Sequence, residues 1–188
     1  YEAFLQAEGL LTETQVADIR KKMKARINQE LKNAFEEADV EVSLPVELQD
    51  VYAESEAQAI APASAKTKEM RFVDAVSDGL REAMQRHDKL VLMGQDIAEY
   101  GGVFKITDGF VDDFGKDRVR NTPLCESAIL GAALGLSLKG HKAMVEMQFA
   151  DFVTCGFNQI VNNLAKLHYR WGQAADVVIR MPTGGSVG

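Results

Sequence analysis

Residues 119–147 read VRNTPLCESAILGAALGLSLKGHKAMVEM, and this stretch decides the fold. We predict a short strand at Val119–Asn121, a helix at Ser127–Leu138 and a second strand at Ala143–Met147. The helix is apolar nearly all round, so we expect it to be buried. A strand, a buried helix and another strand in succession favour two parallel strands with the helix packed on their sheet.

The same alternation continues on both sides of this stretch. Apolar residues at helical spacing predict a helix near residues 72–84, and the run LVLMG at 90–94 is typical of a buried parallel strand. A long helix is expected from Asp151 to about Arg170, followed by a strand at Val177–Arg180. The fold class is therefore α/β, a parallel sheet with flanking helices. Because its last strand runs straight into a glycine-rich end, we expect this domain to be truncated.

The N-terminal part of the chain has a different pattern. Residues 1–54 are expected to be helical, and Thr12-Glu13-Thr14-Gln15 fits a capping box. One apolar stripe follows at steps of three and four, made of Val16, Ile19, Met23, Ile27, Leu31 and Phe35. We expect the stripe to face a core or to bridge domains; the alternative is a free-standing helix that binds a partner. Residues 55–67 are expected to be an acidic and Ala/Pro-rich linker.

Charge and composition exclude some function classes. The net charge is −7, and no Lys or Arg occurs between Lys32 and Lys66, a window with eight acidic residues. The chain has no basic cluster that would form a nucleic-acid-binding face. It also has no charge-free apolar run long enough for a transmembrane helix. Two cysteines give no disulfide framework, so a cytoplasmic location is expected.

Glu126 is the acidic residue of greatest interest, because it opens the predicted helix at 127–138 directly after a strand and a short turn. One interpretation is structural, since the helix dipole stabilises a carboxylate in the first turn. The other is functional, since a partly buried carboxyl group at a strand–helix junction could exchange a proton with a bound heterocycle. The chain lacks phosphate-binding loop motifs and metal-ligand spacings of His and Cys. The residues alone leave both interpretations open.

Four ordered blocks, however, resemble the beta chain of 2-oxo acid dehydrogenases. Residues 94–105 resemble the pattern GEDV-x-x-YGGVFK, and residues 118–126 resemble R-V-x-(D/N)-T-P-(I/L)-x-E. Residues 146–152 resemble E-(I/M)-Q-F-A-D-(Y/F), and residues 158–170 resemble the helix that follows it in the family. This resemblance covers residues 68–188. Residues 1–54 resemble the C-terminal end of the alpha chain of the same enzymes.

The resemblance implies a junction in a fused alpha–beta decarboxylating component of the branched-chain (2-oxoisovalerate) type. Residues 1–54 would be the end of an alpha-type region, and residues 68–188 a beta-type pyrimidine-binding domain that is incomplete at its C-terminus. The implied cofactor is thiamine diphosphate. In the family, the glutamate that matches Glu126 hydrogen-bonds the pyrimidine nitrogen and promotes the imino tautomer. Gln148 and Phe152 match positions near the cofactor.

Metal ions and partners are implied in the same way. Backbone carbonyls of Ala175, Val177 and Val178 match a potassium site of the family, while the Mg²⁺ ligands are expected outside this chain. The expected reaction is decarboxylation of a branched-chain 2-oxo acid and transfer of the acyl group to a lipoyl-bearing acyltransferase component. A dimer of the fused chain is expected, and the isolated chain is expected to be inactive.

Two alternatives remain at this point. The first is a pyruvate or acetoin dehydrogenase component. The second is a non-catalytic assembly fragment, in which the helix at 16–35 and the helix with Gly131 and Gly135 serve only contacts between chains.

Overall fold

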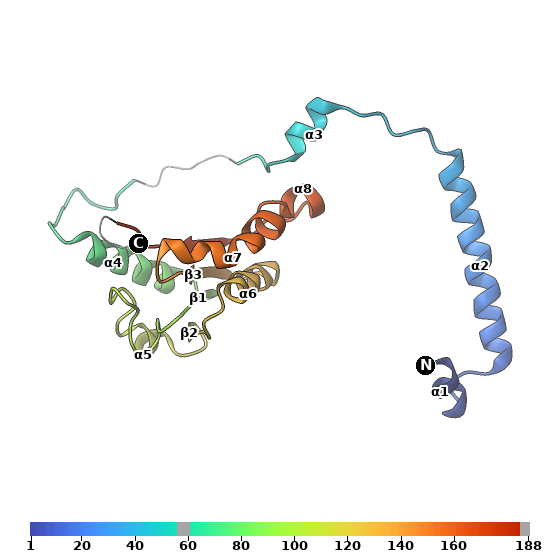
Figure 1. Cartoon of the computed structure of the whole chain (residues 1–188), viewed down its shortest axis with the longest axis horizontal. Helices are drawn as coiled ribbons and strands as arrows, with labels where there is room; N and C mark the ends of the chain where they lie inside the picture. The colour runs from blue at the N-terminus through green and yellow to red at the C-terminus, as the bar shows by residue number, and fades with distance from the viewer. Residues whose placement is uncertain (56–60, 185–188) are drawn as a thin grey trace. The chain divides into compact units, whose positions relative to one another are not determined.

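The structure, a computed structural model, describes residues 1–55 and 61–184. Residues 56–60, which belong to the predicted linker, lie outside the described residues. The chain divides into two compact units, Tyr1–Leu44 and Pro45–Gly188, and Figure 1 shows the elements of each.

A four-stranded parallel sheet forms the centre of the second unit. It consists of β1 (Leu90–Gly94), β2 (Val119–Asn121), β3 (Lys142–Glu146) and β4 (Val177–Arg180), in the order β2-β1-β3-β4. The predicted α/β class, the four strands and their parallel direction are confirmed. The strands also end together, because Gly94 pairs with Asn121 and Glu146, and Glu146 pairs with Arg180. The residues that follow them therefore meet at one edge of the sheet, which we call the carboxyl edge.

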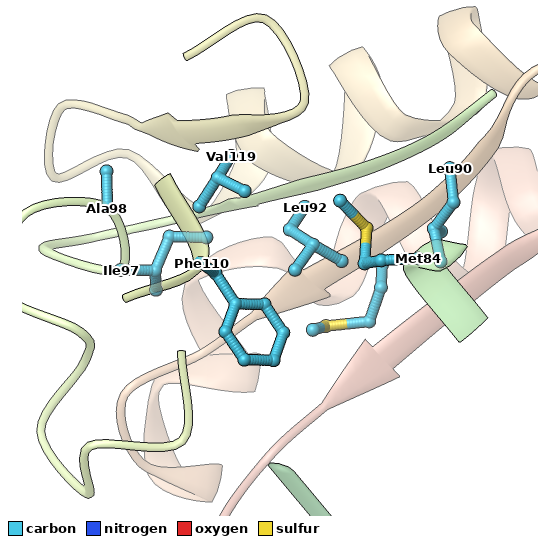
Figure 2. Packing of buried hydrophobic residues seen from close by; sticks show 8 residues of the cluster. Met84, Leu90, Leu92, Ile97, Ala98, Phe110 and Val119 are labelled. Carbon is cyan, nitrogen blue, oxygen red and sulfur yellow. The ribbon is translucent and has the colours of Figure 1, made fainter. Parts of the chain in front are cut away.

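Each face of the sheet has its own core, because successive side chains of a strand point to opposite faces. On one face, Leu90, Leu92 and Met144 pack with helices α4 (Phe72–Arg86) and α5 (Phe110–Phe114). Figure 2 shows the Phe110 ring beside Leu92 and Met84 in this core. On the other face, residues of β1 and β3 pack with α6 (Glu126–Leu138).

Two sequence predictions about helices need correction. Helix α6 is not buried all round: Ala128, Ala132, Gly135 and Leu138 form an exposed outer face. The long helix expected at 151–170 is interrupted. It divides into η1 (Ala150–Phe152), α7 (Val153–Gln159), the π-helical turn η2 (Ile160–Leu164) and α8 (Leu167–Trp171). The Ala165 N–H donates to the Ile160 carbonyl at 2.8 Å, an i→i+5 bond that widens the helix where Ile160 packs on the core.

The first unit contains α1 (Glu2–Ala7) and α2 (Glu13–Glu36), and α3 (Leu44–Asp50) begins at its end. The predicted capping box is present: Thr12 and Gln15 satisfy each other's backbone N–H groups. Within residues 1–44 the stripe does not face a core, and the domain-bridging role stays a prediction. Only Val16 is buried, and the other five residues of the stripe are about half exposed or more.

Among the described residues, no helix is both long enough and apolar enough to cross a membrane.

Candidate functional site

Buried polar side chains gather at the carboxyl edge of the sheet. Within the described part of the chain, the buried polar or charged residues are Gln95, Thr107, Glu126 and Glu146. Gln95 directly follows β1, Glu126 begins the helix after β2, and Glu146 ends β3. Ligands of open parallel α/β sheets bind outside the carboxyl ends of the strands. This edge is therefore the candidate site.

Glu126 and Gln95 form the centre of this site. Glu126 is 8% exposed and Gln95 is 7% exposed, and the Gln95 Nε2 donates to Glu126 Oε1 at 3.2 Å. Glu126 is the first residue of α6, where unpaired backbone N–H groups stabilise a carboxylate. No hydrogen bond to its Oε2 is found among residues 1–55 and 61–184. That oxygen remains available to a ligand.

The sequence predicted Glu126 as a site residue but did not identify Gln95. The two residues are 31 positions apart and meet only because β1 and β2 are neighbours in the sheet. The sequence did contain a signal that could have identified Gln95, which is the first residue after a buried strand that ends in glycine.

Backbone hydrogen bonds fix the two segments that carry Gln95 and Glu126. The Thr122 N–H donates to the Gly94 carbonyl at 2.9 Å, which ties the end of β1 to the turn before α6. The Ala98 N–H donates to Asn121 Oδ1 at 2.8 Å, a second tie between the same segments. Two hydrogen bonds thus tie the chain on either side of Gln95 to the segment just before Glu126, which favours a preorganised site.

Close packing of α7 on α6 contributes to the burial of Glu126. A Cβ on Gly156 of α7 would lie 2.5 Å from Leu130 Cδ1, and 3.4 Å from the backbone C and O of Glu126. The glycine lets the two helices approach this closely without a shift of the Leu130 side chain.

The segment of residues 96–109, which we call the glycine loop, covers the ends of β1 and β3. Asp96 has φ +55°, a left-handed conformation that is uncommon for a non-glycine residue, and its carbonyl accepts from the Gly102 N–H at 2.8 Å. The Thr107 hydroxyl donates to the Ile97 carbonyl at 2.6 Å. Gly101 has φ +77°, and a Cβ there would lie 2.7 Å from Asp108 Cα. The loop is therefore a compact turn with glycine required at its tightest point.

Gln148 and Phe152 lie beyond the carboxyl end of β3. Gln148 is half-buried, and Phe152 is 38% exposed. The Phe152 ring packs edge-on against Phe149 at 5.9 Å, and Phe149 packs against Phe104 of the glycine loop at 6.2 Å. Both predicted residues are therefore at the same edge of the sheet as Glu126. The roles predicted for them stay predictions.

The carbonyls predicted to bind potassium lie at or just before the amino end of β4, opposite the carboxyl edge. The Asp176 carbonyl accepts from the Ala143 N–H at 3.1 Å, and the Arg180 carbonyl accepts from the Met147 N–H at 3.0 Å. Because carbonyls alternate along a strand, the Val178 carbonyl also faces β3, whereas the Val177 carbonyl faces the open edge. Ala175 precedes the strand. The potassium site stays a prediction.

No group of three or more His, Cys, Asp or Glu residues in the described ranges could hold a metal ion.

Sequence comparisons with known proteins give the family of the domain that carries this edge. The sequence profile described as "Transketolase, pyrimidine binding domain" matches residues 68–188. The chain belongs to this family. The match includes the whole sheet and every buried polar residue of the candidate site.

Relatives of the chain include beta subunits of 2-oxo acid dehydrogenases. It is 41% identical over 134 residues to the pyruvate dehydrogenase E1 component subunit beta of Leifsonia xyli, covering 70% of this chain and 40% of that protein. It is 41% identical over 120 residues to the 2-oxoisovalerate dehydrogenase subunit beta of Bacillus subtilis, covering 63% and 37%. The 3-methyl-2-oxobutanoate dehydrogenase subunit beta of Mycobacterium tuberculosis is 40% identical over 124 residues, covering 65% and 36%. The chain thus spans well under half the length of these relatives.

Proposed function

We propose that this chain is part of a 2-oxo acid dehydrogenase decarboxylating component and holds the aminopyrimidine ring of thiamine diphosphate at the carboxyl edge of its sheet. The observation that carries the proposal is the buried carboxylate of Glu126 at the first turn of α6, with one oxygen bonded to Gln95. Membership of a pyrimidine-binding-domain family supports the same conclusion.

The residues of this edge fit one half of the cofactor. Glu126 Oε2 is the atom that would carry the proton of a hydrogen bond to a pyrimidine ring nitrogen, while Gln95 keeps Oε1 engaged. Phe152 offers a half-exposed aromatic surface for stacking, and Gln148 an amide for hydrogen bonding. The bound cofactor supplies carbanion stabilisation for decarboxylation.

The remainder of the enzyme completes the proposed activity. We assign the Mg²⁺ and diphosphate sites to regions outside this chain, and a potassium ion to the carbonyls of Ala175, Val177 and Val178. The substrate is a branched-chain 2-oxo acid, and the acyl group passes to a lipoyl-bearing acyltransferase component. The fused alpha–beta architecture, its dimer and its cytoplasmic location belong to the same proposal, and this chain by itself is inactive.

Two other candidates each have a specific observation in their favour. Pyruvate is favoured as substrate by the Leifsonia xyli relative, whose identity equals that of the Bacillus subtilis relative. A non-catalytic assembly fragment is favoured by the exposed apolar stripe of α2.

The test is decarboxylation of 2-oxoisovalerate and pyruvate by the complete enzyme that contains this chain. Glu126→Gln removes the proton-carrying oxygen and keeps the shape of the side chain, so we expect a loss of turnover of about 10²- to 10⁴-fold. Glu82→Gln is the control, because Glu82 is an exposed acid in the C-terminal half of α4. A higher kcat/KM for pyruvate would reverse the substrate assignment. Unchanged turnover of Glu126→Gln would favour the assembly fragment.

A further inference from the structure

Glu146 and Arg180 form an ion pair at the carboxyl edge that the proposed function does not use. Glu146 ends β3 and its side chain is 1% exposed; Arg180 ends β4, directly opposite, and its side chain is 18% exposed. The Arg180 Nη2 contacts Glu146 Oε2, but within the described residues neither Glu146 oxygen has a partner in hydrogen-bond geometry, and Arg180 Nε has none. Burial lowers the pKa of Arg180 from its ordinary value, because it disfavours the charged guanidinium.

The glycine loop lies directly against this carboxylate. A Cβ on Gly102 would lie 3.5 Å from Glu146 Oε1 and 3.6 Å from the Thr107 hydroxyl oxygen. Gly102 also has φ +77°, which disfavours any other residue. The loop backbone therefore lies close to the Glu146 carboxylate, separated from it by a space about the size of one methyl group.

A short series of contacts joins Gly102 to the candidate site. The Gly102 N–H donates to the Asp96 carbonyl at 2.8 Å, and Asp96 is the left-handed residue that directly follows Gln95. Gln95 in turn donates to Glu126 at 3.2 Å. A displacement of Gly102 would thus move the backbone that orients the Gln95 side chain.

We propose that the Glu146–Arg180 pair is a positioning device, which holds the glycine loop on the ends of β1 and β3 and thereby orients Gln95 toward Glu126. This inference rests on the proposed function of Glu126. Stability alone does not account for the pair, because apolar residues of similar volume often replace a buried ion pair without loss of stability. What an apolar pair cannot supply is a charged surface that fixes a polar loop in one position.

The experiment replaces the pair by apolar residues, as Glu146→Leu with Arg180→Met, in the complete protein. We expect a melting temperature close to that of the parent protein. The Thr107 N–H donates to the Gly101 carbonyl at 3.2 Å, within the same loop as the Gly102 bond. We expect hydrogen-exchange protection of the Gly102 and Thr107 amides to fall by about tenfold or more, since these two bonds would open more often. Thiamine diphosphate should bind more weakly, and turnover should fall with it.

The matched control is Lys142→Met, which breaks the exposed ion pair of Lys142 with Asp176 at the opposite end of the same two strands. It should leave the hydrogen-exchange protection of the Gly102 and Thr107 amides, here called loop protection, unchanged. If the double variant does not fold, Glu146→Gln keeps the side-chain volume and removes the charge, and it should lower loop protection in the same way. Parent-like loop protection in whichever of these variants folds would overturn the proposal.

Loop protection, the hydrogen-exchange protection of the Gly102 and Thr107 amides, also separates this inference from the proposed function. If Glu126→Gln retains full turnover but the apolar pair loses loop protection, the proposed function fails and the pair still positions the loop. If Glu126→Gln is inactive and the apolar pair keeps its loop protection and cofactor affinity, the proposed function stands and the positioning role is wrong.

Discussion

The two ends of the strand pair β3–β4 each carry an ion pair, and the surroundings of these pairs are opposite. At the amino end, Lys142 and Asp176 are 42% and 56% exposed. At the carboxyl end, Glu146 is buried close to Gly102 of the glycine loop, and Arg180 is partly buried. An exposed pair costs little and contributes little, whereas a buried pair has to compensate for the loss of water around both charges.

This difference extends to the sheet as a whole. The buried polar residues of the described chain lie at the carboxyl edge or in the loop that covers it. The strand interiors behind them consist of apolar residues that pack in two cores. In this molecule, buried polar side chains thus lie at the edge where we propose the function, and apolar packing supports that edge.

The first way to test this contrast is to make the carboxyl edge apolar at Gln95. Gln95→Leu removes a hydrogen bond to a carboxylate, which contributes about 1.5–3 kcal/mol, so turnover should fall about 10- to 150-fold. Steady-state kinetics of the complete enzyme provide the measurement. Gln85→Leu, on the exposed side of α4, is the control and should have no effect. Normal turnover of Gln95→Leu would show that the edge does not depend on this contact.

The second change affects the packing that supports the edge. Gly156→Ala places a Cβ against Leu130 and the backbone of Glu126, so overpacking should destabilise the fold by about 1–3 kcal/mol. Gly79→Ala in α4 meets no atom within 4 Å and should instead stabilise it by about 0.5–1 kcal/mol. Urea denaturation measures both. Equal effects of the two substitutions would contradict the close α6–α7 approach.

The smallest effect is expected at the amino end. Lys142→Met removes one exposed ion pair and should change the free energy of unfolding by less than about 1 kcal/mol. Thermal denaturation at low and high salt measures the change. A larger loss, comparable to that of Gly156→Ala, would remove the distinction between the two ends of the strand pair.

Local patterns were enough for much of the fold. Short apolar runs placed β1, β3 and β4, and the capping box placed the start of α2. The sequence did not predict the π-helical turn at 160–164, because it arises where Ile160 packs on the sheet. Nor did it predict the exposure of the α2 stripe, since a helical pattern identifies an apolar face but not what covers it.

The sequence by itself determined the strands, the position of Glu126 at a helix start and, through four blocks, the family. These features depend on neighbours within a few residues, or on a pattern that related chains share. Only the tertiary structure decided the contact of Gln95 with Glu126, 31 positions apart, and that of Glu146 with Arg180 close to Gly102. The physical reason is that parallel strands bring their carboxyl ends together through crossovers, so the spacing of these residues along the chain contains no information about their distance in the fold.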